Sequence, residues 1–104
     1  MFVRVNTEYD VELIDADDCT RFHVERSGAL SNDAFGRGLV VAGAGRVDPD
    51  GSVEVLVAWV RAHALGAVAD DWEVRFTSML EYARSKGWLS EDEVGIRAHV
   101  VEGN

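Results

Sequence analysis

A tight turn between two valine-rich runs constrains the fold of this chain more than any other feature. The turn, Asp-Pro-Asp-Gly at residues 48–51, follows an apolar run over residues 38–47 and precedes a second run over residues 52–57. Proline presets φ for the second turn position, and glycine tolerates the positive φ that closes a turn. The two runs are therefore predicted to form a β-hairpin. A helix is the rival interpretation, because residues 53–65 are apolar on all sides, but the alternate valines favour a strand.

Four further segments show the alternation of apolar and polar residues that is typical of strands. In the second of them Tyr9, Val11 and Leu13 share one face, and in the third Phe22 and Val24 point inward. The last of them is expected to pair with the N-terminal strands. The predicted strands cover residues 2–5, 9–14, 20–26 and 94–101.

Helical spacing replaces this alternation from about residue 58 onward. A short helix over residues 58–65 is predicted to end at Gly66, and a longer helix over residues 70–86 is predicted to end at Gly87. Asp70 or Asp71 is the expected N-cap of the longer helix. Its apolar stripe consists of Trp72, Phe76, Met79, Leu80 and Ala83. The predicted fold is a single α+β domain, 1–104, with an antiparallel sheet of about five strands and the helical segment 58–87 packed on one face.

Charge and cysteine content restrict the possible partners and compartment. The net charge of −9 disfavours nucleic acid and anionic membranes as ligands, because both require a basic surface. Cys19 is the only cysteine, so an intrachain disulfide and a cysteine-based zinc cluster are both excluded. The longest apolar stretch, residues 53–60, is too short to span a bilayer. These features predict a cytoplasmic protein.

The known signatures of catalytic, metal and cofactor sites are not met. Residues 40–45 contain two glycines of a dinucleotide-binding turn, but a turn follows them where a helix is needed. Glycine in a strand, at a close approach of another segment, is the preferred interpretation. Asp15, Asp17 and Asp18 lack the further ligands of a calcium loop, and neighbouring acids disfavour a reactive Cys19 thiolate. We therefore expect no metal and no cofactor.

A short repeat supplies one candidate site. Arg21 and His23, like Arg97 and His99, occur in the pattern Arg-x-His-Val within predicted strands. If these strands are neighbours, the four side chains form a cationic cluster with the two imidazoles within about 10 Å of each other. Such a cluster could bind an anionic metabolite or transfer a proton. Two ordinary solvent-facing strands that share a short string by chance are the simpler interpretation.

The helical half contains an unusual number of aromatic residues, and these supply a second lead. Trp59, Phe76 and Tyr82 are candidate walls of a ligand pocket next to the histidines. Alternatively, one or two exposed aromatic residues could form a dimer interface. Our leading hypothesis is a non-enzymatic accessory or interaction protein that forms a homodimer. A small-molecule binding protein or small enzyme that uses the His/Arg patch is the alternative.

Overall fold

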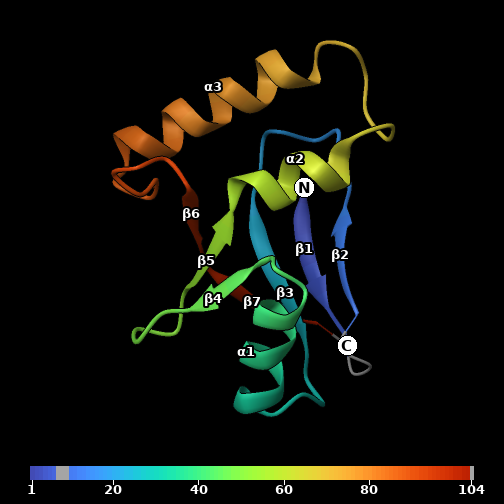
Figure 1. Ribbon diagram of the computed structural model, residues 1–104, viewed down its shortest axis with the longest axis vertical. Coiled ribbons are helices and arrows are strands. Elements are labelled where there is room, and N and C mark those ends of the chain that lie inside the picture. The colour runs from blue at the N-terminus through green and yellow to red at the C-terminus, as the bar shows by residue number, and fades with distance from the viewer. Residues whose placement is uncertain (7–9, 104) are drawn as a thin grey trace.

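The computed structural model describes residues 1–6 and 10–103 and has an α+β architecture (Figure 1). Tyr9, which the sequence places at the start of a strand, lies outside the described residues. In these residues three helices and seven strands follow one another in this order: β1 (Phe2–Val5), β2 (Val11–Ile14), β3 (His23–Ser27), α1 (Asn32–Val41), β4 (Gly45–Val47), β5 (Val53–Leu56), α2 (Val57–Ala64), α3 (Trp72–Ser85), β6 (Gly95–Ala98) and β7 (Val100–Gly103).

The N-terminal strands form a mixed four-stranded sheet in the order β2-β1-β3-β7. β1 pairs antiparallel with β2 but parallel with β3, and β3 pairs parallel with β7. The prediction of one antiparallel sheet was therefore wrong. After β2 the chain crosses back before it enters β3, so β3 runs in the same direction as β1. The predicted pairing of the C-terminal strand with the N-terminal strands is confirmed only for β7, which lies beside β3.

A second, antiparallel sheet has the order β4-β5-β6 and contains the predicted hairpin. Val47 pairs with Val53 across the turn, and Gly51 closes that turn with a φ of 90°. Residues 53–56 are thus a strand, and the rival helix begins only at residue 57. Gly45 also agrees with its interpretation as a close approach, because a Cβ built there would lie 2.0 Å from the Glu54 carbonyl oxygen.

Helix α1 corrects the prediction that residues 38–47 form one strand. The side chain of Ser31 caps the helix by accepting a hydrogen bond from the Ala34 amide, at 3.1 Å. Phe35 and Leu39 are one helical turn apart and both are buried, so packing outweighs the poor helix propensity of the two glycines in this segment. The helix ends before Gly43, whose φ is 72°. Only residues 45–47 remain as a strand.

The C-terminal segment connects the two sheets. The sequence predicts one strand over residues 94–101, but the structure divides the segment into β6, which pairs with β5, and β7, which pairs with β3. The break falls at His99, whose carbonyl oxygen accepts a hydrogen bond from the Val24 amide at 3.0 Å. One continuous stretch of chain therefore lies at an edge of both sheets.

The two predicted helices are confirmed within two residues at each end, as α2 and α3. α3 lies at one end of the molecule and α1 at the other, with the strands between them (Figure 1). Trp72 is buried and its indole nitrogen donates to the Ala16 carbonyl oxygen at 2.6 Å, which ties α3 to the segment that follows β2. Among the described residues no helix has both the length and the apolar character needed to cross a membrane. The largest fully buried side chains are Val3, Val5, Val24, Leu39, Val53, Val55, Val60 and Phe76.

Candidate functional site

The two histidines of the Arg-x-His-Val repeat lie together on one face of the four-stranded sheet. Val24 pairs with Val100, so the preceding residues, His23 and His99, are neighbours across the two strands. Their ring centroids are 5.8 Å apart, with 27° between the ring planes. The imidazoles are thus well within the predicted distance of each other. Phe2, which the sequence analysis did not select, stacks on His23 with the centroids 4.8 Å apart.

The surroundings of His23 favour its neutral form. Partial burial lowers the pKa of His23 most, and the neighbouring His99, the N-terminal ammonium and Arg21 lower it further. Glu25 acts in the opposite direction but does not reverse the shift in pKa. The guanidinium of Arg4 also holds the Glu25 carboxylate, at 3.1 Å. His23 is therefore a neutral imidazole over more of the pH range than an ordinary histidine.

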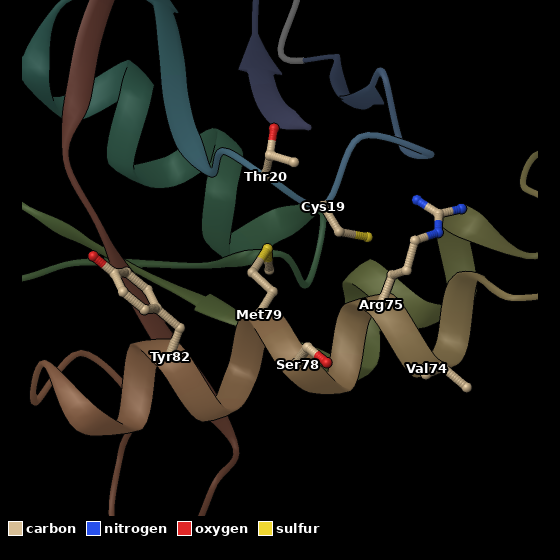
Figure 2. Close-up of a pocket in the computed structure, with 7 residues that line it drawn as sticks. All are labelled: Cys19, Thr20, Val74, Arg75, Ser78, Met79 and Tyr82. Atoms are coloured by element: carbon tan, nitrogen blue, oxygen red, sulfur yellow. The ribbon is translucent and has the colours of Figure 1, made fainter.

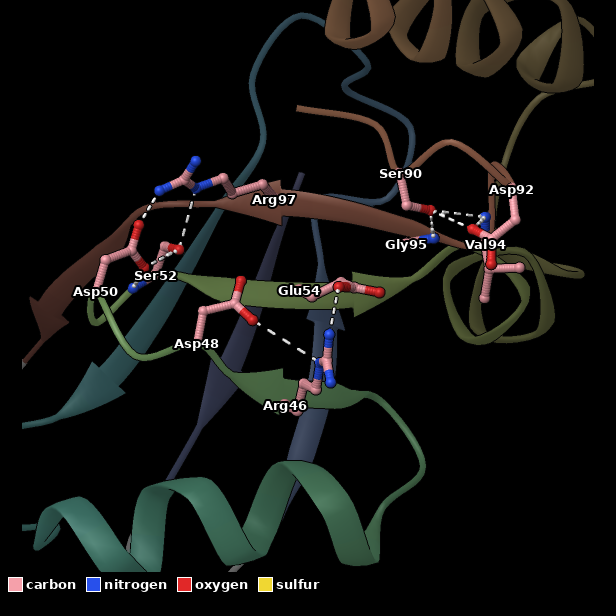
Figure 3. Close-up of polar contacts among 10 residues, drawn as sticks. All are labelled: Arg46, Asp48, Asp50, Ser52, Glu54, Ser90, Asp92, Val94, Gly95 and Arg97. Atoms are coloured by element: carbon pink, nitrogen blue, oxygen red, sulfur yellow. Dashed lines mark hydrogen bonds and ion pairs between the residues drawn. The ribbon is translucent and has the colours of Figure 1, made fainter. Parts of the chain in front are cut away.

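The two arginines of the repeat do not both join the histidines. Arg97 lies in β6, where its guanidinium donates to the Asp50 carboxylate and its Nε lies 3.2 Å from the Ser52 hydroxyl oxygen (Figure 3). Because the chain passes from one sheet to the other at His99, Arg97 belongs to the three-stranded sheet while His99 lies beside β3. Arg21 is exposed and acts on His23 through its charge.

The three aromatic residues predicted as pocket walls also separate. Trp59 and Phe76 are core residues: Trp59 stacks on His63 at 4.1 Å, and Phe76 stacks on Trp72 at 4.6 Å. Tyr82 is 58% exposed. The spacing of the sequence places all three residues on helices. It does not distinguish the buried face of α3, which carries Phe76, from the exposed position of Tyr82.

Tyr82 lines an open groove of about 450 Å³ between α3 and the loop that precedes β3 (Figure 2). Figure 2 shows Met79 and Arg75 reaching from α3 toward Cys19 in that loop. Apart from Tyr82, sequence reasoning missed this groove, because its two walls are more than fifty residues apart in the chain. The described residues that line it are Cys19, Thr20, Val74, Arg75, Ser78, Met79 and Tyr82.

Arg75 links the two walls of this groove by hydrogen bonds from α3 to the loop. Its guanidinium donates to the Asp17 carboxylate at 2.7 Å and to Asp71, one helical turn earlier, at 3.2 Å. The hydrogen bond from Arg75 is the main cause that lowers the pKa of Asp17, and the bond from the Ala69 amide adds to it. The charge of Arg75 is therefore balanced within the molecule.

Cys19 is the one thiol of the chain, and the groove exposes it only partly. Burial is the main cause that raises the pKa of the Cys19 thiol. Arg75 and the N-terminus lower this pKa without reversing the shift, and Asp17 and Asp18 add smaller increases. The neutral thiol is a poor nucleophile. Cys19 therefore serves as an apolar wall of the groove.

The acidic loop beside the groove forms a small hollow lined by Asp15, Asp17 and Asp18. Asp17 is bonded to Arg75, and Asp18 accepts from the Thr20 amide at 2.9 Å. Across residues 1–6 and 10–103, no cluster of three or more His, Cys, Asp or Glu side chains is placed to hold a metal ion.

Comparison with known proteins assigns no family to the chain. No protein-family model, no curated protein and no solved structure matches it. The candidate functions therefore follow from the geometry of this molecule alone.

Proposed function

We propose that the protein is a non-enzymatic interaction protein that forms a homodimer through the outer face of α3. The observation that carries this proposal is the exposure of apolar side chains along the groove: Val74 is 71% exposed and Tyr82 is 58% exposed. Contiguous apolar surface that remains in contact with water is typical of an interaction site. The proposal also places the protein in the cytoplasm, in keeping with its single thiol.

The exposed face of α3 has the shape expected for a helix contact. Val74, Ser78 and Tyr82 follow one another at intervals of four residues, so they form one ridge along the helix. The small Ser78 at the centre of this ridge leaves room for a close approach. Trp88 meets the Tyr82 ring edge-on at 5.9 Å and extends the apolar surface past the end of the helix. Aromatic residues of this kind are enriched at protein interfaces.

The distribution of charge supports a second copy of the chain as the partner that binds the outer face of α3. Two chains with a net charge of −9 repel each other, so they can meet only where the local charge is balanced. Arg75 is the one charged residue among the described residues that line the groove, and Asp17 and Asp71 already neutralise it. A two-fold symmetric dimer uses the same patch on both copies. A mostly apolar patch whose one arginine is neutralised within the same chain is suited to such a contact.

Sedimentation equilibrium tests the dimer and its location. We expect wild-type protein to sediment at about twice the monomer mass of 11.4 kDa, and Val74→Glu to raise the dimer dissociation constant by at least about tenfold, because it places a charge in an apolar contact. Val40→Glu is the matched control, since Val40 is a helical valine that is 64% exposed on α1. A monomeric wild type, or equal dissociation by both variants, contradicts the proposal.

Alkylation of Cys19 gives an independent prediction for the same face. Because burial raises the pKa of this thiol, iodoacetamide should react with it more slowly than with a free cysteine at neutral pH. Since Cys19 lines the groove, the rate should fall further as the protein concentration increases and the dimer covers it. Mass spectrometry of the modified fraction measures both effects, with Val74→Glu as the control that loses only the concentration dependence. If the alkylation rate of the wild type does not change with protein concentration, the groove is not part of the dimer interface.

Binding of an anionic metabolite at the His/Arg patch is the alternative function, and it has weaker support. Arg97 is engaged by Asp50, and Arg21 is the remaining arginine of the repeat near His23. A thermal-shift screen against anionic metabolites separates this alternative from the dimer, because a ligand of the folded state raises the melting temperature without changing the mass of the protein.

A further inference from the structure

We infer that His23 and His99 form a two-histidine site for a divalent transition-metal ion such as Zn²⁺, Ni²⁺ or Cu²⁺. This inference is independent of the proposed dimer, because the two histidines lie on the four-stranded sheet and not on α3. The site rests on three observations: the position of the rings relative to each other, the availability of their nitrogens, and the kind of ligand that they supply.

The sheet holds the two rings at a distance suited to chelation. Neighbouring strands are about 4.8 Å apart, and the two ring centroids are 5.8 Å apart on the same face. Each imidazole nitrogen lies about 2.0–2.1 Å from a bound zinc ion, so two of them on one ion come within about 4 Å of each other. The hydrogen bond from the Val24 amide to the His99 carbonyl oxygen fixes the backbone beside both rings. We therefore expect side-chain rotation, without a shift of the backbone, to bring one nitrogen of each ring onto one ion.

Both imidazoles have nitrogens available for a metal. Within residues 1–6 and 10–103, neither His23 nor His99 makes a side-chain hydrogen bond, and ring stacking is what positions them. His63 differs, because its Nδ1 lies 2.9 Å from the Trp59 carbonyl oxygen and its ring stacks on the Trp59 indole. Phe2 supports His23 from the side opposite His99 and limits the directions in which its ring can turn.

The ligand set selects the class of metal. Two imidazoles suit zinc, nickel and copper, whereas magnesium and calcium require oxygen ligands. Glu25 lies two residues beyond His23 on the same face, but Arg4 holds its carboxylate. The described residues supply no third ligand, so water occupies the other positions on the ion. The positive charges of Arg21 and the N-terminus oppose a cation at His23, while the net charge of −9 attracts cations to the molecule as a whole.

Titration with Zn²⁺, followed by calorimetry and by the imidazole proton resonances, tests the site in the full chain without an added histidine tag. We expect one ion per chain, with shifts at His23 and His99 but not at His63. His23→Gln and His99→Gln should each weaken binding by at least about tenfold. The loss of a residue that only supports a metal ligand already costs about this much, so the loss of a ligand itself should cost no less. His63→Gln is the matched control and should bind as wild type does.

Three results would overturn the inference. The first is a wild-type protein without saturable Zn²⁺ binding, and the second is full binding in either His23→Gln or His99→Gln. The third is a loss in His63→Gln as large as in the other two variants. Because the two test substitutions lie on a partly exposed sheet face, far-ultraviolet circular dichroism should show that both variants remain folded.

Discussion

Replacing Phe76 with alanine is expected to lower the free energy of unfolding by about 3–5 kcal/mol. The Phe76 side chain is 0% exposed, so the truncation leaves a cavity that the core can fill only in part. Its ring stacks on Trp72 with 11° between the planes, a contact that adds to the loss of buried area. The guanidinium of Arg61 in α2 also lies over the ring, 5.2 Å from its centroid. Phe76 thus connects α3 both to its own first turn and to α2.

Urea denaturation monitored by tryptophan fluorescence measures this loss. The matched control is Thr77→Ala, because Thr77 is the next residue of the same helix and is exposed. That control should change the stability by no more than about 0.5 kcal/mol. A loss below about 1 kcal/mol for Phe76→Ala would mean that α3 is not packed against the rest of the core as described.

Gly45→Ala is expected to destabilise the protein by at least about 3 kcal/mol, at the upper end of the usual effect of overpacking. A Cβ at this position would lie 2.0 Å from the Glu54 carbonyl oxygen and 3.1 Å from the Val55 Cα. These are backbone atoms of the paired strand β5, so no side-chain rotation can relieve the clash. The strand must shift, and with it the hydrogen bond from the Leu56 amide to the Ala44 carbonyl oxygen, which is 2.8 Å long.

Gly36→Ala is the control, and its effect should have the opposite sign. A Cβ at Gly36 would meet the Val47 side chain at 3.7 Å, an ordinary van der Waals contact. Since Gly36 lies inside α1, alanine should stabilise the protein by about 0.5–1 kcal/mol through its better helix propensity. The same urea experiment compares the two variants. If both variants changed the free energy of unfolding by a similar amount, the close approach at Gly45 and the helix propensity at Gly36 would not explain the effects of these substitutions.

Local signals in the sequence predicted the hairpin and two of the three helices. Proline and glycine in residues 48–51 determine the geometry of the turn. The helical spacing of the apolar residues in α3 indicates which side of that helix is buried. Helix α1 was missed because the apolar run at residues 38–47 was interpreted as a strand, and Ser31 was not considered as the cap of a helix. What stabilises α1 is the burial of Phe35 and Leu39 against other elements, which no local pattern reports.

Long-range arrangement explains why the candidate site was predicted only in part. The repeat identified two histidines that are in fact adjacent, yet it gave no sign that the chain changes sheets between Arg97 and His99. Phe2 could have been found from its alternation with Val3, but only once the parallel pairing of β1 with β3 was known. The groove forms where Cys19 lies next to α3. This arrangement depends on how the helix packs over the loop, which the sequence does not show.

The division of residues 95–103 between two sheets has a consequence for the order in which the chain assembles. During synthesis this segment leaves the ribosome after the other strands that the structure describes, so β3 and β5 each keep an unpaired edge until it arrives. The β1–β2 and β4–β5 hairpins can form early, because their contacts are local. Both open edges are then closed in one late step. A chain stalled before residue 95 exposes two strand edges at once, the condition in which partly made chains pair with one another and aggregate.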